Sequence, residues 1–212
     1  MCSVDFNLYC YRLHHDFGLA PNPFWGYLTL AVCKPGIRNN SKLKVGDWVV
    51  GSGSKQLKNE GSLIFAMKVQ EILTFDEYWE DPRFDIKKPR LDGSLAVMYG
   101  DNFYHTDFFS GCFIQEKSAH SSPKFAKHHL ESDTKGKNVL ISQDFYYFGD
   151  KYVFPPEKFS SIANPAPRGF TFKKFDKHLK IDFIHWLRLS FETGIHGDPI
   201  SWREYLRTGH SI

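Results

Sequence analysis

The sequence has few of the features that most readily identify a function. Its four cysteines, Cys2, Cys10, Cys33 and Cys112, are scattered and form no Cys-x-x-Cys pair, which argues against a thiolate zinc site. No apolar run is long enough to span a membrane, and the N-terminus lacks the charged-then-apolar pattern of a signal peptide. These absences predict a cytoplasmic protein with no membrane partner, whose thiols stay reduced and mostly buried.

Catalytic signatures are also missing from the sequence. It contains no G-x-S-x-G, no H-E-x-x-H and no zinc-deaminase pattern, and the loop 52–55 lacks the spacing of a phosphate-binding Walker motif. No histidine stands beside Cys33 or Cys112, so nucleophilic catalysis is unsupported. We therefore predict no metal and no cofactor. The net charge of only +3 permits nucleic acid as a partner without indicating it.

Aromatic residues are abundant, at 17% of 212 residues, with twenty Phe and ten Tyr. They favour strands, bring large buried areas and supply faces on which bases can stack. Alternation and turn signals predict strands at 4–12, with one buried face, and at 48–50, 63–70, 108–115, 139–142 and 145–148, and either a short strand or a helix turn at 28–32. The runs 48–50 and 63–70 are expected to form a hairpin, because the link between them is polar and contains glycine.

Two helices are predicted. Thr74 and Glu77 form a capping box for a short helix over 74–79, and a long helix over 180–193 should end at a Gly194 cap. Pro35 should hold Lys34 in extended geometry, and the polar stretch 117–137 should be a flexible or ligand-ordered loop. These elements predict an α+β fold, a small mixed β-barrel with peripheral helices and a C-terminal helix. We expect one domain over 1–160 and a helical extension over 161–212 packed on it.

The stretch 14–53 gathers charged and aromatic residues beside proline and glycine turns, as loops that bind ligands do. His15 and Asp16 could line a pocket as a polar pair. Adjacent residues of an extended segment point apart, so a metal shared by His14 and His15 is disfavoured. Asn22, between two prolines, could read a base edge with its amide or could simply satisfy its own turn.

The other candidates in this half are open between ligand contact and structure. Phe24, Trp25 and Trp48 could stack on a base or belong to the core. Lys34, Arg38, Ser52 and Lys55 could bind phosphate or could be solvated surface. Asp47 is a turn cap or an acid–base group. In the second half, Tyr104, His105, His120, the pair His128–His129 and Asp133 could complete a site.

Long blocks of this sequence carry a family resemblance. They are HHDFGLAPNPFWGYLTLAVCKPGIR, VGDWVVGSGS, LIFAMKVQEILTFDEYWEDPRF, the pair Tyr104-His105, and VLISQDFYYFG. The chain resembles the nucleotide modification associated domain 2 family of bacteria and their phages through most of 5–155, and more weakly through 183–199. The order of turn, strand, polar loop, strand and acidic helix also looks like the PUA-like barrels, including EVE and ASCH domains, which hold nucleobases.

This resemblance implies binding of a modified nucleobase, nucleotide or modified DNA, in a system that modifies or senses bases. The ligand-binding residues would be Asn22, Phe24, Trp25, Lys34, Arg38, Trp48, Ser52, Lys55, Tyr104 and His105. One alternative is an enzyme of nucleotide or base modification, with His15, Asp16, Asp47 and His105 as acid–base groups. A second alternative is a non-catalytic protein partner of a modification enzyme.

Overall fold

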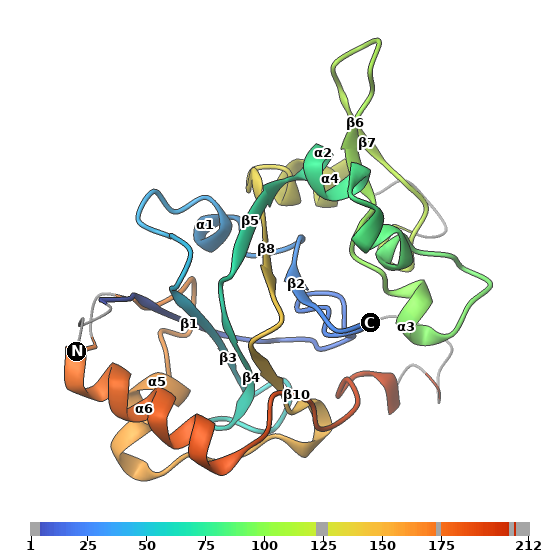
Figure 1. Ribbon diagram of the computed structural model, residues 1–212. Coiled ribbons are helices and arrows are strands. Elements are labelled where there is room, and N and C mark those ends of the chain that lie inside the picture. Colours follow the sequence, from blue (N-terminus) through green and yellow to red (C-terminus); the bar gives the residue numbers. More distant parts are fainter. Residues whose placement is uncertain (1–4, 122–126, 173–174, 204–205, 207–212) are drawn as a thin grey trace.

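The computed structural model describes residues 5–121, 127–172, 175–203 and 206. Its described part is an α+β fold of three sheets with mostly short helices (Figure 1). The strands are β1 (Leu8–Arg12), β2 (Leu28–Leu30), β3 (Trp48–Ser52), β4 (Leu63–Lys68), β5 (Glu71–Thr74), β6 (Tyr104–Thr106), β7 (Phe113–Gln115), β8 (Asn138–Ser142), β9 (Phe145–Tyr147) and β10 (Gly194–Ile195). The helices are α1 (Pro35–Arg38), α2 (Phe75–Glu80), α3 (Leu95–Met98), α4 (Lys127–Asp133), α5 (Ser160–Ala163) and α6 (Lys177–Ser190), with 3-10 turns η1 (Pro82–Lys87), η2 (Gly149–Lys151) and η3 (Glu157–Phe159).

The largest sheet has five strands in the order β1-β3-β4-β9-β10. Strands β3 and β4 pair antiparallel, which confirms the hairpin predicted from the polar, glycine-containing link between them. Strand β1 lies parallel to β3, and β10 lies parallel to β9. The chain therefore returns from its C-terminal part to complete one edge of this sheet.

A second sheet, in the order β2-β8-β5, is joined to the first by two chain corners. One corner separates β4 from β5 at Val69 and Gln70, and the other separates β8 from β9. The Val69 N–H donates to Asp47 O, whereas the Gln70 N–H donates to Ile141 O in the other sheet. Because consecutive residues bond to different sheets, the described strands form separate layers and close no barrel. The α+β class is confirmed, but the described strands differ from the single barrel that we expected.

Three apolar clusters lie between and outside these sheets. One packs α5 and α6 against the outer face of the five-stranded sheet, and a second fills the space between that sheet and the strands β2 and β8. The third lies on the far side of the three-stranded sheet, beneath α2, η1 and β6. The long helix predicted near the C-terminus covers one face of the molecule, and the β6–β7 hairpin projects from the opposite side (Figure 1).

Strand β1 differs from its prediction because both of its faces are buried. Leu8 and Cys10 lie in the cluster under α6, while Tyr9 and Tyr11 face the cluster between the sheets and are at most 1% exposed. Tyrosine combines an apolar ring with a polar tip. The alternation of Tyr9 and Tyr11 with Leu8 and Cys10 therefore predicts a solvent-exposed face for the tyrosines, although both are buried.

Other local predictions had mixed outcomes. The capping box of α2 is confirmed, with the Glu77 N–H donating to Thr74 Oγ1 and the Thr74 N–H donating to the Glu77 carboxylate. Lys34 is left-handed, with φ of 44°, and not extended. The preceding Cys33 is fixed by hydrogen bonds of its N–H to Asp133 and of its carbonyl to Arg38, and these contacts shape the turn before α1. Helix α6 ends at Ser190, with Phe191 as its C-cap, and Gly194 begins β10 instead of capping the helix.

In the second half, the segment predicted as a loop over 117–137 contains α4, and the residues 122–126 within it lie outside the described part. The strand predicted over 108–115 is β7 alone, because 107–112 form a turn. Cys10, Cys33 and Cys112 are free thiols, while Cys2 lies outside the described residues. No helix among the described residues is both long enough and apolar enough to cross a membrane.

Candidate functional site

A cavity of about 590 Å³ opens beside the three-stranded sheet. Its walls come from loop 15–20, loop 33–35, Tyr99 at the end of α3, loop 119–120 and helix α4. Segments separated by more than a hundred residues in sequence therefore meet around one hollow. Ligand sites for small molecules fall in the range of about 300–1,000 Å³, and this volume suits a nucleotide.

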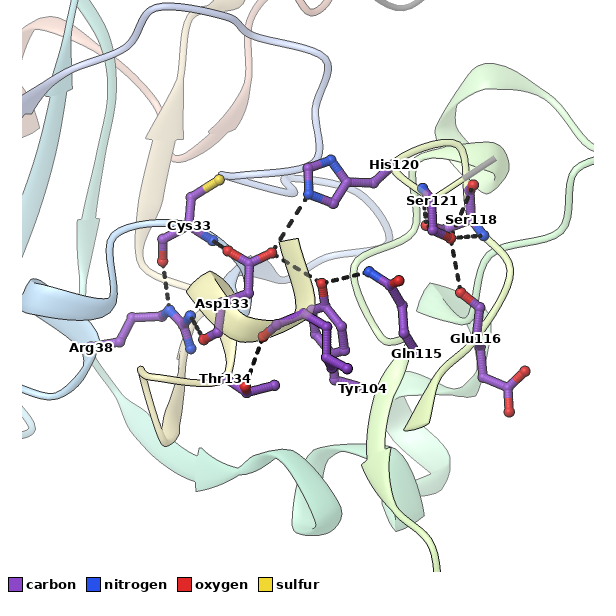
Figure 2. Close-up of polar contacts among 11 residues, drawn as sticks. Cys33, Arg38, Tyr104, Gln115, Glu116, Ser118, His120, Ser121, Asp133 and Thr134 are labelled. Carbon is purple, nitrogen blue, oxygen red and sulfur yellow. Dashed lines mark hydrogen bonds and ion pairs between the residues drawn. The ribbon is translucent and has the colours of Figure 1, made fainter. Parts of the chain in front are cut away.

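Asp133, in the wall of the cavity, gathers polar groups from three other segments (Figure 2). Its Oδ1 accepts a hydrogen bond from the Cys33 N–H at 2.8 Å, and its Oδ2 accepts one from the Tyr104 hydroxyl at 3.1 Å. The Nε2 of His120 lies 3.5 Å from the same Oδ2. We call Cys33, Tyr104, His120 and Asp133 the Asp133 cluster.

The electrostatics of the cluster keep its carboxylate charged. Burial would by itself raise the pKa of Asp133, but the nearby His120 side chain, the hydrogen bond from the Cys33 N–H and the charge of Arg38 outweigh burial and lower this pKa. Burial raises the pKa of the Tyr104 phenol and raises that of the Cys33 thiol to about 11. At neutral pH the cluster thus holds one carboxylate beside a neutral phenol and a neutral thiol, and this thiol is not an activated nucleophile.

Arg38 supports the cluster from behind. Its guanidinium donates to the backbone carbonyls of Cys33, Asp133, Gly136 and Asn138 at 2.6–2.9 Å, and its side chain is fully buried. A Cβ at Gly136 would lie only 2.7 Å from Arg38 Cζ, so this position needs glycine. Arg38 thereby ties α1 to the end of α4 and the start of β8.

His120 is held by the loop that carries it. The Ser118 N–H donates to Ser121 Oγ at 3.0 Å, and Ser121 Oγ donates to Glu116 O at 3.1 Å (Figure 2). The ring of His120 lies 4.0 Å from that of His129, centroid to centroid, on α4. Burial, followed by the neighbouring histidines, lowers the pKa of His129. Within the described ranges, no group of three or more His, Cys, Asp or Glu side chains is arranged to hold a metal ion.

The opposite wall of the cavity is aromatic. The rings of Phe17 and Tyr99 stack at 5.2 Å with an interplanar angle of 15°, and His15 stacks on Phe17 at 6.1 Å. A ring nitrogen of His15 lies 3.0 Å from Gln56 Nε2. These rings give the cavity a flat apolar surface next to its polar side.

Lys34 supplies a cation at the cavity. Both Cys33 and Lys34 have positive φ, 55° and 44°, a conformation that L residues adopt at a cost and that is enriched at functional sites. The Lys34 Nζ lies 4.6 Å from the ring centroid of Tyr11, and burial lowers the pKa of this lysine. Among the described residues, no carboxylate forms an ion pair with Lys34, and the buried Tyr11 hydroxyl has no hydrogen-bond partner.

Of the residues singled out from the sequence, the structure brings His15, Lys34, Tyr104, His120, His129 and Asp133 together around the cavity. Asn22 and Arg38 stand behind its walls. The Asn22 Nδ2 donates to the carbonyls of Gly18 and Tyr99, and its Oδ1 accepts from Lys87 Nζ at 2.6 Å. Both side chains use their hydrogen-bonding capacity on the protein.

The remaining candidates lie elsewhere. Asp16 is buried against Tyr147 and Ile200, Asp47 accepts hydrogen bonds from Asn7 and the Lys44 N–H, and Trp48 is in the core under α6. Two candidates stack on other aromatic rings, Phe24 on Trp202 and His105 on Trp79. The Ser52 hydroxyl donates to the carbonyl of Tyr11, and Lys55 is exposed. Trp25 has a left-handed backbone, with φ of 58°.

Sequence reasoning did not single out Phe17, Tyr99 or the backbone of Cys33. Phe17 stands in the His-His-Asp-Phe-Gly run, where its proximity to polar residues was a usable signal. No local pattern reveals that Cys33 bonds to a carboxylate a hundred positions away.

The described residues thus form an α+β fold with a cavity lined by polar and aromatic side chains. The family model for nucleotide modification associated domain 2 matches residues 5–206, and the chain belongs to this family. The family's description links the chain to nucleotide modification. Comparisons with curated proteins and with solved structures give no match.

Proposed function

We propose that this protein binds a nucleobase or nucleotide, modified or within modified DNA, in the cavity beside the Asp133 cluster. It would do so as part of a system that modifies or senses nucleic-acid bases. The observation that carries the proposal is the convergence, at one cavity, of a buried ionised carboxylate, a stacked aromatic wall and a lysine with no carboxylate partner among the described residues. The family's link to nucleotide modification supports the same conclusion.

Each part of the cavity matches one part of a nucleotide. Phe17 is stacked between Tyr99 and His15, so a planar base would extend this stack at its exposed His15 end, where stacking on an aromatic ring contributes about 1–3 kcal/mol per base. The ammonium of Lys34 suits a phosphate. Asp133 orients His120 through Nε2, and the second ring nitrogen of His120 would then bond to the edge of the base. The described strands close no barrel, so the PUA-like comparison stays a hypothesis about the type of fold.

Titration of nucleosides and nucleotides, unmodified and modified, tests the proposal by calorimetry. We expect at least one nucleotide to bind with a Kd below about 1 mM. Replacing Lys34 by Ala should weaken nucleotide binding about tenfold or more, because a charge-assisted hydrogen bond to phosphate is lost. The matching nucleoside should bind the variant as it binds the wild type.

Lys55→Ala is the matched control, since Lys55 is exposed and does not line the cavity. It should leave the affinities unchanged. Equal losses in the two lysine variants would mean that the cavity is not the binding site. Failure of every member of the panel to bind more tightly than about 1 mM would exclude the proposed function.

A second candidate is an enzyme of nucleotide modification, favoured by the His120–Asp133 pair. A carboxylate that orients an imidazole is the arrangement of a general base. Chromatography of nucleotides incubated with the protein would detect turnover. A product lost on His120→Ala, with binding retained, would favour this candidate over a binding protein.

A further inference from the structure

The ionisable side chains that line the cavity are mostly bases. The described lining contains His15, Lys34, His120 and His129. Among the described lining residues, Asp133 is the only carboxylate, and both of its oxygens already accept hydrogen bonds from the protein. Because basic groups outnumber acidic ones around one hollow, the cavity favours a ligand that carries negative charge.

Three histidine rings stack where loop 119–120 meets helix α4. The ring of His129 lies 4.0 Å from that of His120 and 4.0 Å from that of His128, centroid to centroid, with interplanar angles of 50° and 40°. His128 is exposed, whereas His129 is half-buried and lines the cavity. His129 is thus the middle ring of this histidine stack, with an imidazole on each side of it.

The surroundings of His129 keep its ring uncharged at neutral pH. Burial, followed by the neighbouring His120 and His128, lowers the pKa of His129, and the carboxylate of Asp133 opposes this change only in part. Two imidazolium rings at such a short separation would repel each other. Without a bound anion, His129 therefore stays neutral at pH 7, although it faces the cavity.

A positive potential also exists around Lys34. The pKa of His14 is lowered by partial burial and then by the charges of Lys34 and His15. Lys34 and His15 both belong to the cavity wall. The wall thus combines a permanent cation, at Lys34, with a histidine that is ready to become a second cation when an anion arrives.

We propose that the cavity takes up one proton from solvent together with the phosphate group of its nucleotide, and that His129 receives this proton. This inference rests on the proposed function and specifies how the phosphate is bound. A phosphate group has three strong acceptor oxygens, so it can accept from an imidazolium and from the Lys34 ammonium at once. Its negative charge would offset the repulsion within the histidine stack.

Proton uptake makes the affinity depend on pH. A phosphate beside His129 stabilises the charged ring, so the pKa of His129 is higher in the complex than in the free protein. Because binding and protonation are linked, the affinity rises as pH falls between these two pKa values, by at most about tenfold per pH unit for one proton. A metal-binding histidine cluster would show the opposite dependence, since a metal ion displaces protons from its ligands.

Calorimetry in two buffers of different ionisation enthalpy measures the protons taken up on binding. The probes are nucleoside 5′-monophosphates, the matching nucleosides and a short single-stranded DNA, titrated from about pH 8 to pH 6.5, above the second phosphate pKa of about 6. The wild type should take up about half a proton to one proton per monophosphate near pH 7 and bind it about tenfold more tightly at the lower pH. The nucleosides should show neither effect.

The decisive variant is His129→Gln, which keeps a polar side chain that does not titrate. Its proton uptake should fall below about half of the wild-type value, and its affinity for the monophosphate should change little with pH. His129→Lys carries a fixed charge, so it should bind the monophosphate more tightly than His129→Gln at about pH 8, again with little proton uptake. His185→Gln, which changes an exposed histidine on α6, is the matched control and should behave as the wild type.

Proton uptake with the monophosphate identifies a terminal phosphate as the ligand group, and uptake with the DNA identifies a backbone phosphate. Either result supports the proposal. Monophosphate binding without proton uptake, equal uptake with the nucleoside, or wild-type uptake in His129→Gln would overturn the inference and leave the proposed function standing. Failure of every probe to bind would remove both.

Discussion

Asp16 is a fully buried carboxylate whose partners come from the far end of the chain. The Tyr147 hydroxyl donates to its Oδ1 at 2.7 Å, and the Ile200 N–H donates to its Oδ2 at 3.2 Å. Burial raises its pKa to about 6, although these hydrogen bonds oppose the increase. Between the ordinary carboxyl pKa and about pH 6, the folded protein therefore holds a proton that the unfolded chain has lost.

This difference predicts a pH dependence of stability. The free energy of unfolding should fall as pH rises from about 4 to 7, with Asp16 contributing up to about 3 kcal/mol of the fall, at roughly 1.4 kcal/mol per pKa unit. In Asp16→Asn this component should vanish, because the amide does not titrate. Urea unfolding of both proteins across this pH range measures it, and parallel curves would contradict the assignment.

For single residues, the sequence predicts which polar side chains lie near the site better than it predicts what each one binds. Asn22 and Arg38 were chosen for their capacity to bond a base or a phosphate, yet both spend that capacity on carbonyl groups of the protein. A residue type shows what a side chain can bond to, but not whether the partner is a ligand or the backbone. Asp133 and His120 were named from sequence, while their contact with each other depends on tertiary structure alone.

Among the elements, Arg38 connects α1 to α4 and β8. Its guanidinium donates to backbone carbonyls of Asp133, Gly136 and Asn138, and removing it would take away these donors from buried groups. Arg38→Ala should therefore lose about 3 kcal/mol or more of unfolding free energy and loosen the Asp133 cluster.

Chemical denaturation measures this loss, and Arg38→Lys provides a graded comparison. Lysine keeps the charge but cannot make the forked contacts, so its stability should lie between those of the wild type and the alanine variant. A stability of Arg38→Ala within about 0.5 kcal/mol of the wild type would show that the carbonyls find other partners.

Elements with local signals were predictable. The capping box of α2 depends on two residues three positions apart, and the β3–β4 hairpin depends on two strands joined by a short link. Both predictions were confirmed. Strand β6 was not predicted, since it is three residues long and depends on pairing with β7. The left-handed Lys34 escaped prediction because the contacts of Cys33 and Lys34, not the following proline, decide its conformation.

For the whole molecule, the modest net charge limits how DNA would bind. Each phosphate neutralised on B-DNA contributes about −0.9 to the slope of log K against log salt. With Lys34 as the phosphate contact of the proposed complex, Lys34→Ala should reduce the magnitude of this slope by about 1, while Lys55→Ala should leave the slope unchanged.

Anisotropy titrations of a short DNA duplex that carries a bound modified base, at several salt concentrations, give these slopes. An unchanged slope in Lys34→Ala would remove this lysine from the phosphate contact.

The α+β class followed from the pattern of short strands, but the division into sheets did not. It depends on the corners at 69–70 and 143–144, where hydrogen bonds change sheets.

The attachment of residues 199–202 to loop 15–17 has a consequence for biosynthesis. The Ser201 N–H donates to Asp16 O, the Asp16 N–H donates to Ser201 Oγ, and Trp202 Nε1 donates to the carbonyl of Phe17, whose ring lines the cavity. A chain emerging from the ribosome exposes loop 15–17 long before those partners are made. The cavity wall is therefore completed only after synthesis of this segment, and a nascent chain stalled earlier would carry an unfinished binding site.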